Sequence, residues 1–476
     1  MTSTALPEAA LEDITRRVVE RLLKTELPAK PPTIPSGNLS GLFPTVDQAV
    51  AAARQAWEKF TQMPVRLRGE IIASIRRLGR SQARALAELA RQETGQGRVG
   101  DKEILNFLAL TRTPGVEDLL PAAFSGDHGL TLVEPAPYGV IAAFTPAVSS
   151  SETILGNAIA MLAGGNAVVF CPNPAAARVS QAAVGLIHQA VLAAEGPPNL
   201  VTTLINPSLG QAQELMRHPG ISMLVVTGGN QAVREAMGSG KKAICAGPGN
   251  PPVVVDESAD LEAAGRDIVL GASLDNNTVC VAEKAVFVAE AAVNQLLRAM
   301  ERHGAILLSP FHLKRLERVI FTGDPREGII NPKWMGKDAK DILGEIEIPA
   351  DHRLRLALVE TGKDHPLVAA EQMMPVLPVV RVKNVDEGID LALNAEGGRG
   401  HTAVMHSRRI DKLSLMARRV GTAIFVKNGP SYAGLGHQGE GFTSFTIATT
   451  TGEGLTRPRH FTRERRCVLK DLFRIV

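Results

Sequence analysis

The chain has 476 residues, more than one ordinary hydrophobic core contains, which predicts two or three domains. A charged fraction of 21% and a formal net charge of +3 are those of a globular protein and give no reason to expect a nucleic-acid partner. No apolar run approaches the ~20 residues of a membrane-spanning helix, and the N-terminus lacks the apolar segment of a secretory signal. We therefore expect no membrane span and a cytoplasmic location.

The first segment predicts a short amphipathic helix on a tether. Residues 9–24 place Leu11, Ile14 and Val18 at helical spacing between charged residues. The proline-rich stretch over residues 25–41 cannot continue a helix or pack a core, so we interpret it as a semi-rigid linker. A frayed tail is the simpler interpretation of the helix, but its uncovered apolar stripe favours a peptide that docks in a groove of a partner protein.

Two regions of alternating strands and helices follow, after amphipathic helical patterns over residues 46–60 and 71–89. The expected strands of the first region are residues 139–144, 166–170, 200–205 and 222–227. Those of the second region, which runs from about Pro248 to Glu440, include residues 251–256, 374–382, 401–407 and 422–428. Short apolar strands between amphipathic helices indicate parallel sheets covered on both faces, in a doubly wound α/β design. We expect two lobes with a cleft between them.

The first candidate for chemistry is Cys280, in the stretch SLDNNTVCVAEKAVFV. It follows polar residues 275–278, which indicate a turn or loop, and it precedes an apolar strand. A loop thiol at a cleft suits covalent attack on a carbonyl, because sulfur is nucleophilic even when only partly ionised. Taken alone, a free cysteine is more often inert filler. Cys171, Cys245 and Cys467 form no CxxC pair or metal spacing with it, so we expect no metal site and a reducing compartment.

Two glycine-containing segments make Cys280 a stronger candidate for the catalytic nucleophile. VVTGG, residues 225–229, ends an apolar strand and opens a helix, where glycines let the backbone and the helix N-terminus approach a phosphate. The signal is weak by itself, since GG also forms ordinary turns and the full GxGxxG pattern is absent. AGPGNPPVVVD, residues 246–256, starts the second region with a rigid hinge, which plain packing explains equally well.

Taken together, the motifs of this chain resemble the aldehyde dehydrogenase superfamily. In chain order they are PYGVIAAFTP, GGNAVVF, VVTGG, GPGNPPVVVDESAD, DNNTVC, EQMMPVLPVV and KNGPSYAGLG. Within the superfamily the chain resembles the CoA-acylating aldehyde dehydrogenases of bacterial microcompartments, over nearly its whole length. TPGVEDL, GAILLSP and NGPSYAG are more similar to the propionaldehyde members, from propanediol breakdown, than to the acetaldehyde members, from ethanolamine breakdown.

The resemblance implies a role for each matching residue. Cys280 is the nucleophile that forms a thiohemiacetal with the aldehyde; hydride passes to NAD⁺, and the thiol of CoA releases the remaining thioester as acyl-CoA. The backbone N–H of Cys280 is the expected oxyanion donor. The implied cofactor-binding residues are Thr145 and Pro146 in the loop lining the cleft, Thr227, Gly228 and Gly229 beside the nicotinamide and pyrophosphate, Glu371 on the nicotinamide ribose, and His401 at the cleft. Without the resemblance, Glu371 is equally an exposed strand-edge residue and His401 a structural histidine.

One expected residue is absent. Hydrolytic relatives keep a glutamate that activates water, and the matching position in CAGPGN is Ala246. Water at neutral pH is a poor nucleophile without a base, whereas a thiol is partly ionised by itself. The sequence therefore predicts a thioester that persists until CoA arrives. Two further departures are Val148, where hydrolytic relatives have the oxyanion asparagine, and Cys171, where many relatives have a lysine that reaches the adenine ribose. The second oxyanion donor stays open.

The resemblance also implies a domain layout and an assembly. The predicted units are a docking helix (1–24), a linker (25–41), an NAD-binding domain (42–118 and 137–247), a catalytic domain (248–440), and an oligomerisation element with the C-terminal tail (119–136 and 441–476). Relatives form dimers or dimers of dimers through the last of these. The helix over 9–24 resembles the encapsulation peptide that docks such enzymes to a shell protein, which implies the microcompartment lumen as the location.

Three alternatives accompany the leading hypothesis of a propanal-oxidising, NAD-dependent, CoA-acylating enzyme. A hydrolytic aldehyde dehydrogenase would make free acid, and Ala246 argues against it. An acetaldehyde-specific acylating enzyme would share all of the chemistry. The third alternative is a shell-associated homologue without catalysis. It is favoured by Val148 and by the sequence TPAVSSSE, where subfamily members usually have TPxxNP.

Overall fold

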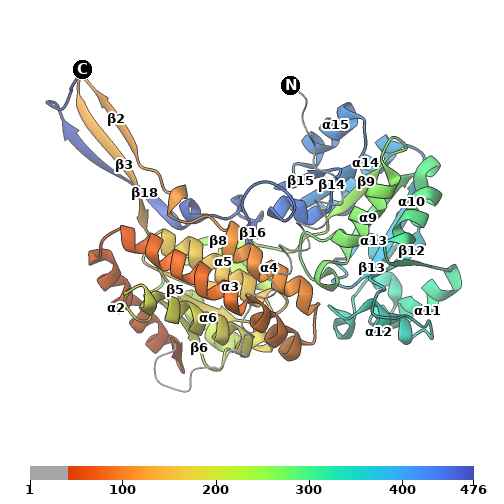
Figure 1. The fold of residues 1–476 in the computed structure, drawn as a ribbon, viewed down its shortest axis with the longest axis horizontal. Coiled ribbons are helices and arrows are strands. Elements are labelled where there is room, and N and C mark those ends of the chain that lie inside the picture. Colours follow the sequence, from red (N-terminus) through yellow and green to blue (C-terminus); the bar gives the residue numbers. More distant parts are fainter. Residues whose placement is uncertain (1–40) are drawn as a thin grey trace, which may run out of the picture.

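The computed structural model of the chain describes residues 41–476. The predicted docking helix over residues 9–24 lies outside them, as does all of the predicted linker except its last residue. Two lobes, each built on a parallel sheet, lie side by side, and a narrow antiparallel sheet extends from the first lobe (Figure 1). The predicted α/β class with two doubly wound lobes is confirmed.

The first lobe contains a six-stranded parallel sheet in the order β1-β6-β5-β4-β7-β8. Its strands are β1 (Leu42–Phe43), β4 (Val140–Thr145), β5 (Ala167–Pro172), β6 (Val201–Leu204), β7 (Met223–Thr227) and β8 (Lys242–Ala246). Its helices are α2 (Val46–Gln62), α3 (Arg66–Thr94), α4 (Val99–Arg112), α5 (Ser150–Ala163), α6 (Ala177–Ala193), α7 (Leu209–Arg217) and α8 (Asn230–Met237). Helices α5 and α6 pack on one face of the sheet and carry α3 outside them, while α2, α7 and α8 contact its strands from the other side.

The second lobe contains a seven-stranded parallel sheet in the order β11-β12-β13-β10-β9-β14-β15. Its strands are β9 (Pro252–Val255), β10 (Ala285–Ala289), β11 (Ala305–Leu308), β12 (Leu356–Thr361), β13 (Val376–Val382), β14 (Thr402–His406) and β15 (Ile424–Lys427). Its helices are α9 (Leu261–Ala272), α10 (Glu290–Arg302), α11 (Pro310–Ile320), α12 (Ala339–Gly344), α13 (Pro366–Ala369), α14 (Val385–Glu396) and α15 (Ile410–Val420).

The central strands of the second sheet are apolar on both faces because helices cover both faces. In β10, Val286 and Val288 belong to the core cluster that contains α9 and α10, whereas Phe287 belongs to the cluster that contains α14 and α15. Successive side chains of a strand point to opposite faces, so a doubly covered strand must be apolar at every position. This requirement explains the unbroken runs of valine and isoleucine that predicted parallel sheets.

A three-stranded antiparallel sheet, β18-β3-β2, projects away from the first lobe (Figure 1). It consists of β2 (Ala122–Gly126), β3 (Gly129–Pro137) and β18 (Thr462–Lys470), and the tail pairs with β3 along the full length of both strands. Most of its residues are exposed. The excursion over 129–135 and the C-terminal tail thus form one structure, and their role in oligomer contacts stays a prediction. Two short strands, β16 (Ile447–Ala448) and β17 (Gly454–Leu455), lead into this tail.

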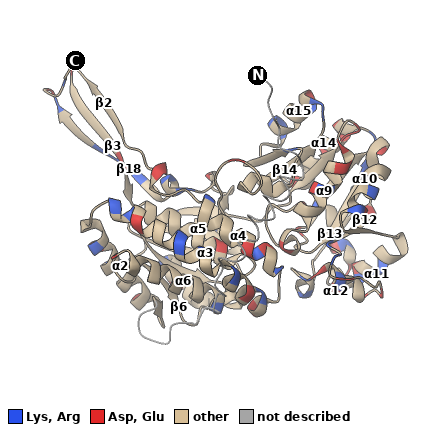
Figure 2. Cartoon of the chain, viewed as in Figure 1, with Lys and Arg blue, Asp and Glu red and all other residues tan. Residues whose placement is uncertain are grey.

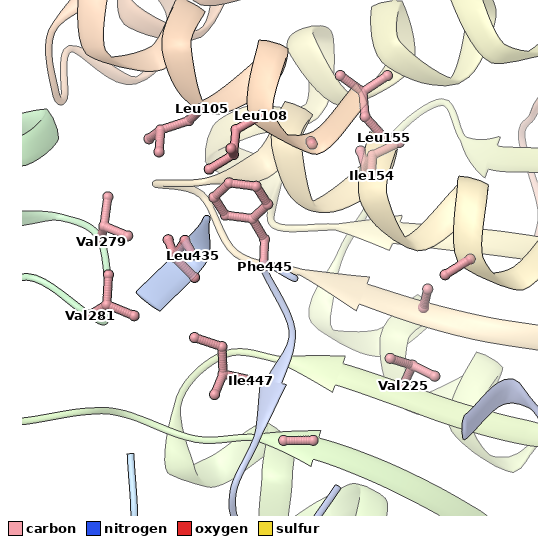
Figure 3. Close-up of a cluster of buried hydrophobic side chains, with 14 of the residues drawn as sticks. Leu105, Leu108, Ile154, Leu155, Val225, Val279, Val281, Leu435, Phe445 and Ile447 are labelled. Atoms are coloured by element: carbon pink, nitrogen blue, oxygen red, sulfur yellow. The ribbon is translucent and has the colours of Figure 1, made fainter. Parts of the chain in front are cut away.

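The two lobes share a continuous core at their junction. Figure 3 shows Phe445 and Ile447 between the helices and strands of the first lobe and Val279 and Val281, which flank Cys280 in the second. Charged residues of both signs are interspersed over both lobes (Figure 2). Over residues 41–476, no helix has the length and apolar character needed to cross a membrane.

A buried asparagine ties three parts of the first lobe together. Asn166 follows α5 and is fully buried. Its Oδ1 accepts hydrogen bonds from the backbone N–H groups of Tyr138 (2.8 Å) and Gly139 (3.1 Å). Its Nδ2 donates to the carbonyl oxygens of Met161 (3.1 Å) and Phe461 (2.9 Å). One side chain therefore joins the start of β4, the end of α5 and the segment that leads into the projecting sheet.

We predict that Asn166→Ala lowers the free energy of unfolding by about 3 kcal/mol, because buried backbone groups lose their partners. Urea denaturation followed by circular dichroism measures the change. Asn173→Ala is the matched control, since Asn173 is exposed and its Oδ1 accepts only from the Ala175 N–H. It should cost less than about 1 kcal/mol. Equal effects of the two substitutions would contradict the assignment.

Candidate functional site

A cavity of about 190 Å³ lies where the carboxyl ends of β4 and β7 meet the second lobe. The strand order of the first sheet reverses between β4 and β7, and open α/β sheets bind ligands at such switch points. The cavity is lined by Pro146, Val148, Ser149, Thr227, Gly228, Gly229, Ala246, Gly247, Pro248, Thr278, Val279, Cys280, Glu371, Met373, His401, Phe445 and Ile447.

The cavity brings together most of the residues that the resemblance singled out. Lining residues among them are Cys280, Pro146, Thr227, Gly228, Gly229, Glu371 and His401. Thr145 is not on the lining: it is the last residue of β4, it is buried, and its hydroxyl has no hydrogen-bond partner. The structure thus places the cysteine of the second lobe opposite the glycine turn of the first. The individual roles of these residues stay predictions.

The polar run before Cys280 forms a short 3-10 turn (Leu274–Asn277) that is completely enclosed by protein. Asp275, Asn276 and Asn277 all have left-handed backbone angles, with φ of 47°, 56° and 66°. Aspartate and asparagine tolerate this region better than other residues with side chains, because their short polar groups bond locally. Cys280 follows in a turn closed by the Ala282 N–H, which donates to the Val279 carbonyl oxygen (3.0 Å). This agrees with the predicted loop position, but the polar residues do not face solvent.

Protein groups replace water around this turn. Asn277 Nδ2 donates to the carbonyl oxygens of Ala272 (2.7 Å) and Glu283 (3.0 Å). Asn276 Nδ2 donates to the Gly336 carbonyl (3.0 Å) and to Asp338 Oδ1 (2.8 Å). Because every such bond fixes one atom of the turn, the backbone that leads to Cys280 has a single defined course.

The surroundings of Cys280 disfavour its thiolate form. Burial raises its pKa to about 12, and the Glu371 carboxylate acts in the same direction. The Lys284 ammonium and the backbone N–H groups of Cys280 and Val281 oppose this rise. Residues 275–278 before the cysteine are buried, whereas Cys280 itself is partly exposed, and its role as the nucleophile stays a prediction.

Two opposite charges lie close to the thiol. Lys284 is fully buried, and its Nζ donates to the Asn277 carbonyl oxygen (2.8 Å) and to Asn277 Oδ1 (2.5 Å). Burial lowers the pKa of Lys284 to about 8, although the Glu371 carboxylate raises it. Burial also raises the pKa of Glu371, whose Oε1 accepts a hydrogen bond from the Gly249 N–H (3.3 Å). The ammonium favours a negative sulfur and the carboxylate disfavours it.

His401, directly before β14, lines the cavity and is only 1% exposed. Its Nδ1 lies 2.9 Å from Thr402 Oγ1, and its Nε2 has no hydrogen-bond partner. Burial lowers the pKa of His401 to about 4, and Lys284 acts in the same direction. The imidazole is therefore neutral at physiological pH. With a proton on Nδ1, its Nε2 carries a free lone pair and can accept a proton.

Two of the three positions that departed from the family pattern, Ala246 and Val148, lie at the cavity, whereas Cys171 is buried in β5 and does not line it. Ala246 ends β8 on the lining, so no carboxylate stands where hydrolytic relatives have their water-activating base. Val148 lines the cavity with an apolar side chain, and the adjacent Ser149 lines it too. Ser149 precedes α5 and its side chain does not cap that helix. Its hydroxyl is therefore available as a donor to a bound group.

The first-lobe side of the cavity fits a dinucleotide. A side chain built at Gly228 or at Gly229 would meet no atom within 4 Å, so open space lies beside this turn. Helix α8 begins directly after it without a side-chain cap, which leaves its first N–H groups free for a phosphate. The half-buried carboxylate of Glu371 is suited to ribose hydroxyls. Over the described residues, no group of three or more potential ligands is placed to hold a metal ion.

Sequence reasoning missed three residues near this site. Lys102 of α4 donates to the Val148 carbonyl (2.8 Å) and to Asp275 Oδ2 (2.7 Å). Lys284 and Ser149 are the other two. Only Lys284 left a signal in the sequence, because a lysine at the start of the apolar run AVFVA cannot be buried without partners.

The chain matches the aldehyde dehydrogenase family over residues 43–306. It is 48% identical over 468 residues to "Acetaldehyde dehydrogenase (acetylating) EutE" of Salmonella typhimurium, which covers 98% of this chain and 99% of that protein. It is 45% identical over 468 residues to "Propanal dehydrogenase (CoA-propanoylating)" of the same organism, with the same coverage.

Solved structures show the same fold. The propionaldehyde dehydrogenase of Rhodopseudomonas palustris, with bound CoA and an acylated cysteine, has a TM-score of 0.89 and 45% identity, covering 91% of this chain and 98% of that one. A propionaldehyde dehydrogenase from the fucose utilisation bacterial microcompartment of Clostridium phytofermentans has a TM-score of 0.89 and 43% identity, covering 92% and 100%. The chain therefore belongs to the aldehyde dehydrogenase family and, within it, to the CoA-acylating aldehyde dehydrogenases.

Proposed function

We propose that this protein uses NAD⁺ and CoA to oxidise a short-chain aldehyde to its acyl-CoA, through a thioester on Cys280. Propanal is the proposed main substrate. The observation that carries the proposal is the cavity in which Cys280 faces the turn at Gly228 and Gly229, with Ala246 in place of a water-activating glutamate. The names of similar proteins support the substrate class, because they specify acetaldehyde and propanal, and one structure contains CoA and an acylated cysteine.

In the first half-reaction, the sulfur of Cys280 bonds to the carbonyl carbon while its proton passes to the carbonyl oxygen. The Cys280 N–H and the Ser149 hydroxyl donate hydrogen bonds to the oxygen as negative charge develops there. Bound NAD⁺ supplies the hydride acceptor for the carbon. After hydride loss and release of the hydroxyl proton to solvent, the carbon stays bonded to Cys280 as a thioester. The Lys284 ammonium stabilises sulfur whenever it carries negative charge.

In the second half-reaction, the thiol of CoA attacks the thioester carbon. Its proton passes to Nε2 of His401, the bond between that carbon and the Cys280 sulfur breaks, and His401 returns the proton to this sulfur. Water is a poor competitor, because Ala246 stands where hydrolytic relatives have the water-activating glutamate, and a thiol is the better nucleophile. The acyl group therefore leaves on CoA rather than as free acid.

The walls of the cavity suit a small apolar group. Val148, Met373, Phe445 and Ile447 face it together with Cys280. These side chains accommodate an alkyl chain and offer nothing to a polar one. Acetaldehyde is the second candidate substrate, favoured by the acetylating relative described above.

We further propose that the protein acts in a bacterial microcompartment. The apolar stripe over residues 9–24 would dock to a shell protein, and the sheet of β2, β3 and β18 would join subunits into a homodimer or homotetramer. The long exposed edges of this sheet support an assembly role, since unpaired strand edges are normally covered. The microcompartment origin of one similar structure supports the location.

We predict that the enzyme without CoA produces one equivalent of NADH per active site from propanal and then stops. Mass spectrometry should find the propionyl group on Cys280. Cys280→Ala should lower NADH formation by about 10³-fold or more, because the covalent step is lost. Cys467→Ala is the control, since Cys467 is exposed on the projecting sheet. Continued turnover without CoA, or an unmodified Cys280, would refute thioester transfer.

We predict that alkylation of Cys280 by iodoacetamide in the free enzyme accelerates about tenfold per pH unit between about pH 6 and pH 10. The reason is that burial raises the pKa of this thiol to about 12, so the reactive thiolate fraction grows throughout this range. Peptide mapping of the alkylated protein gives the rate. A plateau below about pH 9 would show that the thiol has an ordinary pKa.

We predict that His401→Ala slows thiolysis by about 10²- to 10³-fold, because the thiol of CoA loses its base. The first equivalent of NADH should form at the original rate, which rapid mixing measures. His406→Ala is the matched control: His406 ends β14, the strand that His401 immediately precedes, is also buried, and does not line the cavity. Unchanged steady-state turnover in the His401 variant would remove His401 from the reaction.

A further inference from the structure

A single buried lysine joins the two walls of the cavity. Lys102 projects from α4 in the first lobe and is 1% exposed. Its Nζ donates to the carbonyl oxygen of Val148, 2.8 Å away, and to Oδ2 of Asp275, 2.7 Å away. Val148 belongs to the first-lobe loop that lines the cavity, whereas Asp275 opens the second-lobe turn that leads to Cys280. One ammonium group therefore holds both sides.

Hydrogen bonds of Asp275 connect Lys102 to the residues next to Cys280. Thr278, two residues before Cys280, donates its hydroxyl to Oδ2 of Asp275 at 2.7 Å, and the Arg98 N–H donates to Oδ1 at 2.8 Å. A side chain at Gly97 would come within 2.0 Å of Oδ1, so only glycine lets the backbone approach this closely. The Asp275 carboxylate is thus enclosed by donors whose positions are fixed.

The charge state of Lys102 suits this role. Burial disfavours its ammonium, but the carboxylates of Asp275 and Glu152 outweigh that effect and raise the pKa of Lys102 above its ordinary value. Burial also raises the pKa of Asp275, and the Lys102 ammonium opposes that rise. An ammonium with three N–H donors can serve a carbonyl and a carboxylate at once. A neutral side chain of the same length would fill the space and hold neither partner.

We propose that Lys102 is a positioning residue that fixes the distance between the cofactor-side loop at Val148 and the nucleophile Cys280. The inference rests on the proposed function and adds a residue that touches neither substrate nor cofactor. Hydride transfer needs a near-attack geometry, with reacting atoms about 3–3.5 Å apart. Because the two reactants of that step are held by different lobes, its rate depends on the distance that Lys102 sets.

The second half-reaction depends on this distance much less. Cys280 and His401 both belong to the second lobe, so their mutual position does not require Lys102. CoA reaches the thioester through a flexible arm, which tolerates a small displacement of the first lobe. Lys102 should therefore matter for the redox step and little for acyl transfer, whereas a general loss of structure would impair both.

Two assays on the full-length enzyme separate these cases. One follows the first equivalent of NADH from propanal and NAD⁺ by rapid mixing. The other follows exchange of labelled CoA into propionyl-CoA without any nicotinamide cofactor. Lys102→Met should slow the first by about 100-fold, the loss expected for a displacement near 1 Å, and change the second by no more than about threefold. A deuterated aldehyde should show a larger isotope effect in the variant, because hydride transfer becomes slower than the other steps.

Lys102→Met leaves a buried carboxylate without its partner, so the double variant Lys102→Met/Asp275→Asn is tested beside it. The double variant should also show a slower NADH burst and a nearly unchanged exchange of CoA. Lys241→Met is the matched control: Lys241 donates to the carbonyl oxygens of His218 and Ile221, both at 2.9 Å, and lies off the cavity. Neither rate should change there. Equal losses in both assays, or an unchanged NADH burst, would overturn the positioning role. Absence of both reactions in the wild-type enzyme would instead refute the proposed function, and this inference with it.

Discussion

The enclosed polar turn over Asp275–Thr278 is the constraint on which the site depends. Each of its buried groups would cost about 1–3 kcal/mol without a hydrogen-bond partner, and much of the partnering comes from the first lobe through Arg98 and Lys102. Without the first lobe, Asp275 and Asn276 would lose some of their partners, whereas Asn277 would keep its bonds to Ala272, Glu283 and Lys284 within the second lobe. The same turn therefore joins the two lobes through Asp275 and Asn276, and these bonds fix the width of the cavity between the two sheets.

The same enclosure sets the resting state of the sulfur. Burial and the Glu371 carboxylate raise the pKa of Cys280, while Lys284 and two backbone N–H groups offset part of that effect. A protonated thiol resists oxidation and stray alkylation. Reactivity then depends on a carbonyl carbon close enough to accept the sulfur as its proton leaves. The environment thus restrains the nucleophile until a substrate is present, which is a different design from an exposed, permanently ionised cysteine.

Local patterns predicted the sheets well, because their signals lie within single segments. The apolar runs of β4, β5, β6 and β7, and the glycines that end α5, predicted the centre of the first sheet, whereas its edge strands β1 and β8 were not predicted. Cys280 and the turn at Gly228 were found for the same reason. The burial of residues 275–278 could not be predicted, since polar residues in a row indicate solvent unless their distant partners are known. Lys102 was missed because its two partners lie 46 and 173 positions away along the chain.

The alanine at position 246 determines what becomes of the free energy that aldehyde oxidation releases. Oxidation of an aldehyde to an acid is strongly downhill, and a water-activating carboxylate at this place would release all of that driving force as heat. Without it, the oxidation is captured in an activated acyl compound that can later drive phosphate transfer or carbon–carbon bond formation. A single missing carboxylate thus separates a detoxifying oxidation from one that conserves its energy.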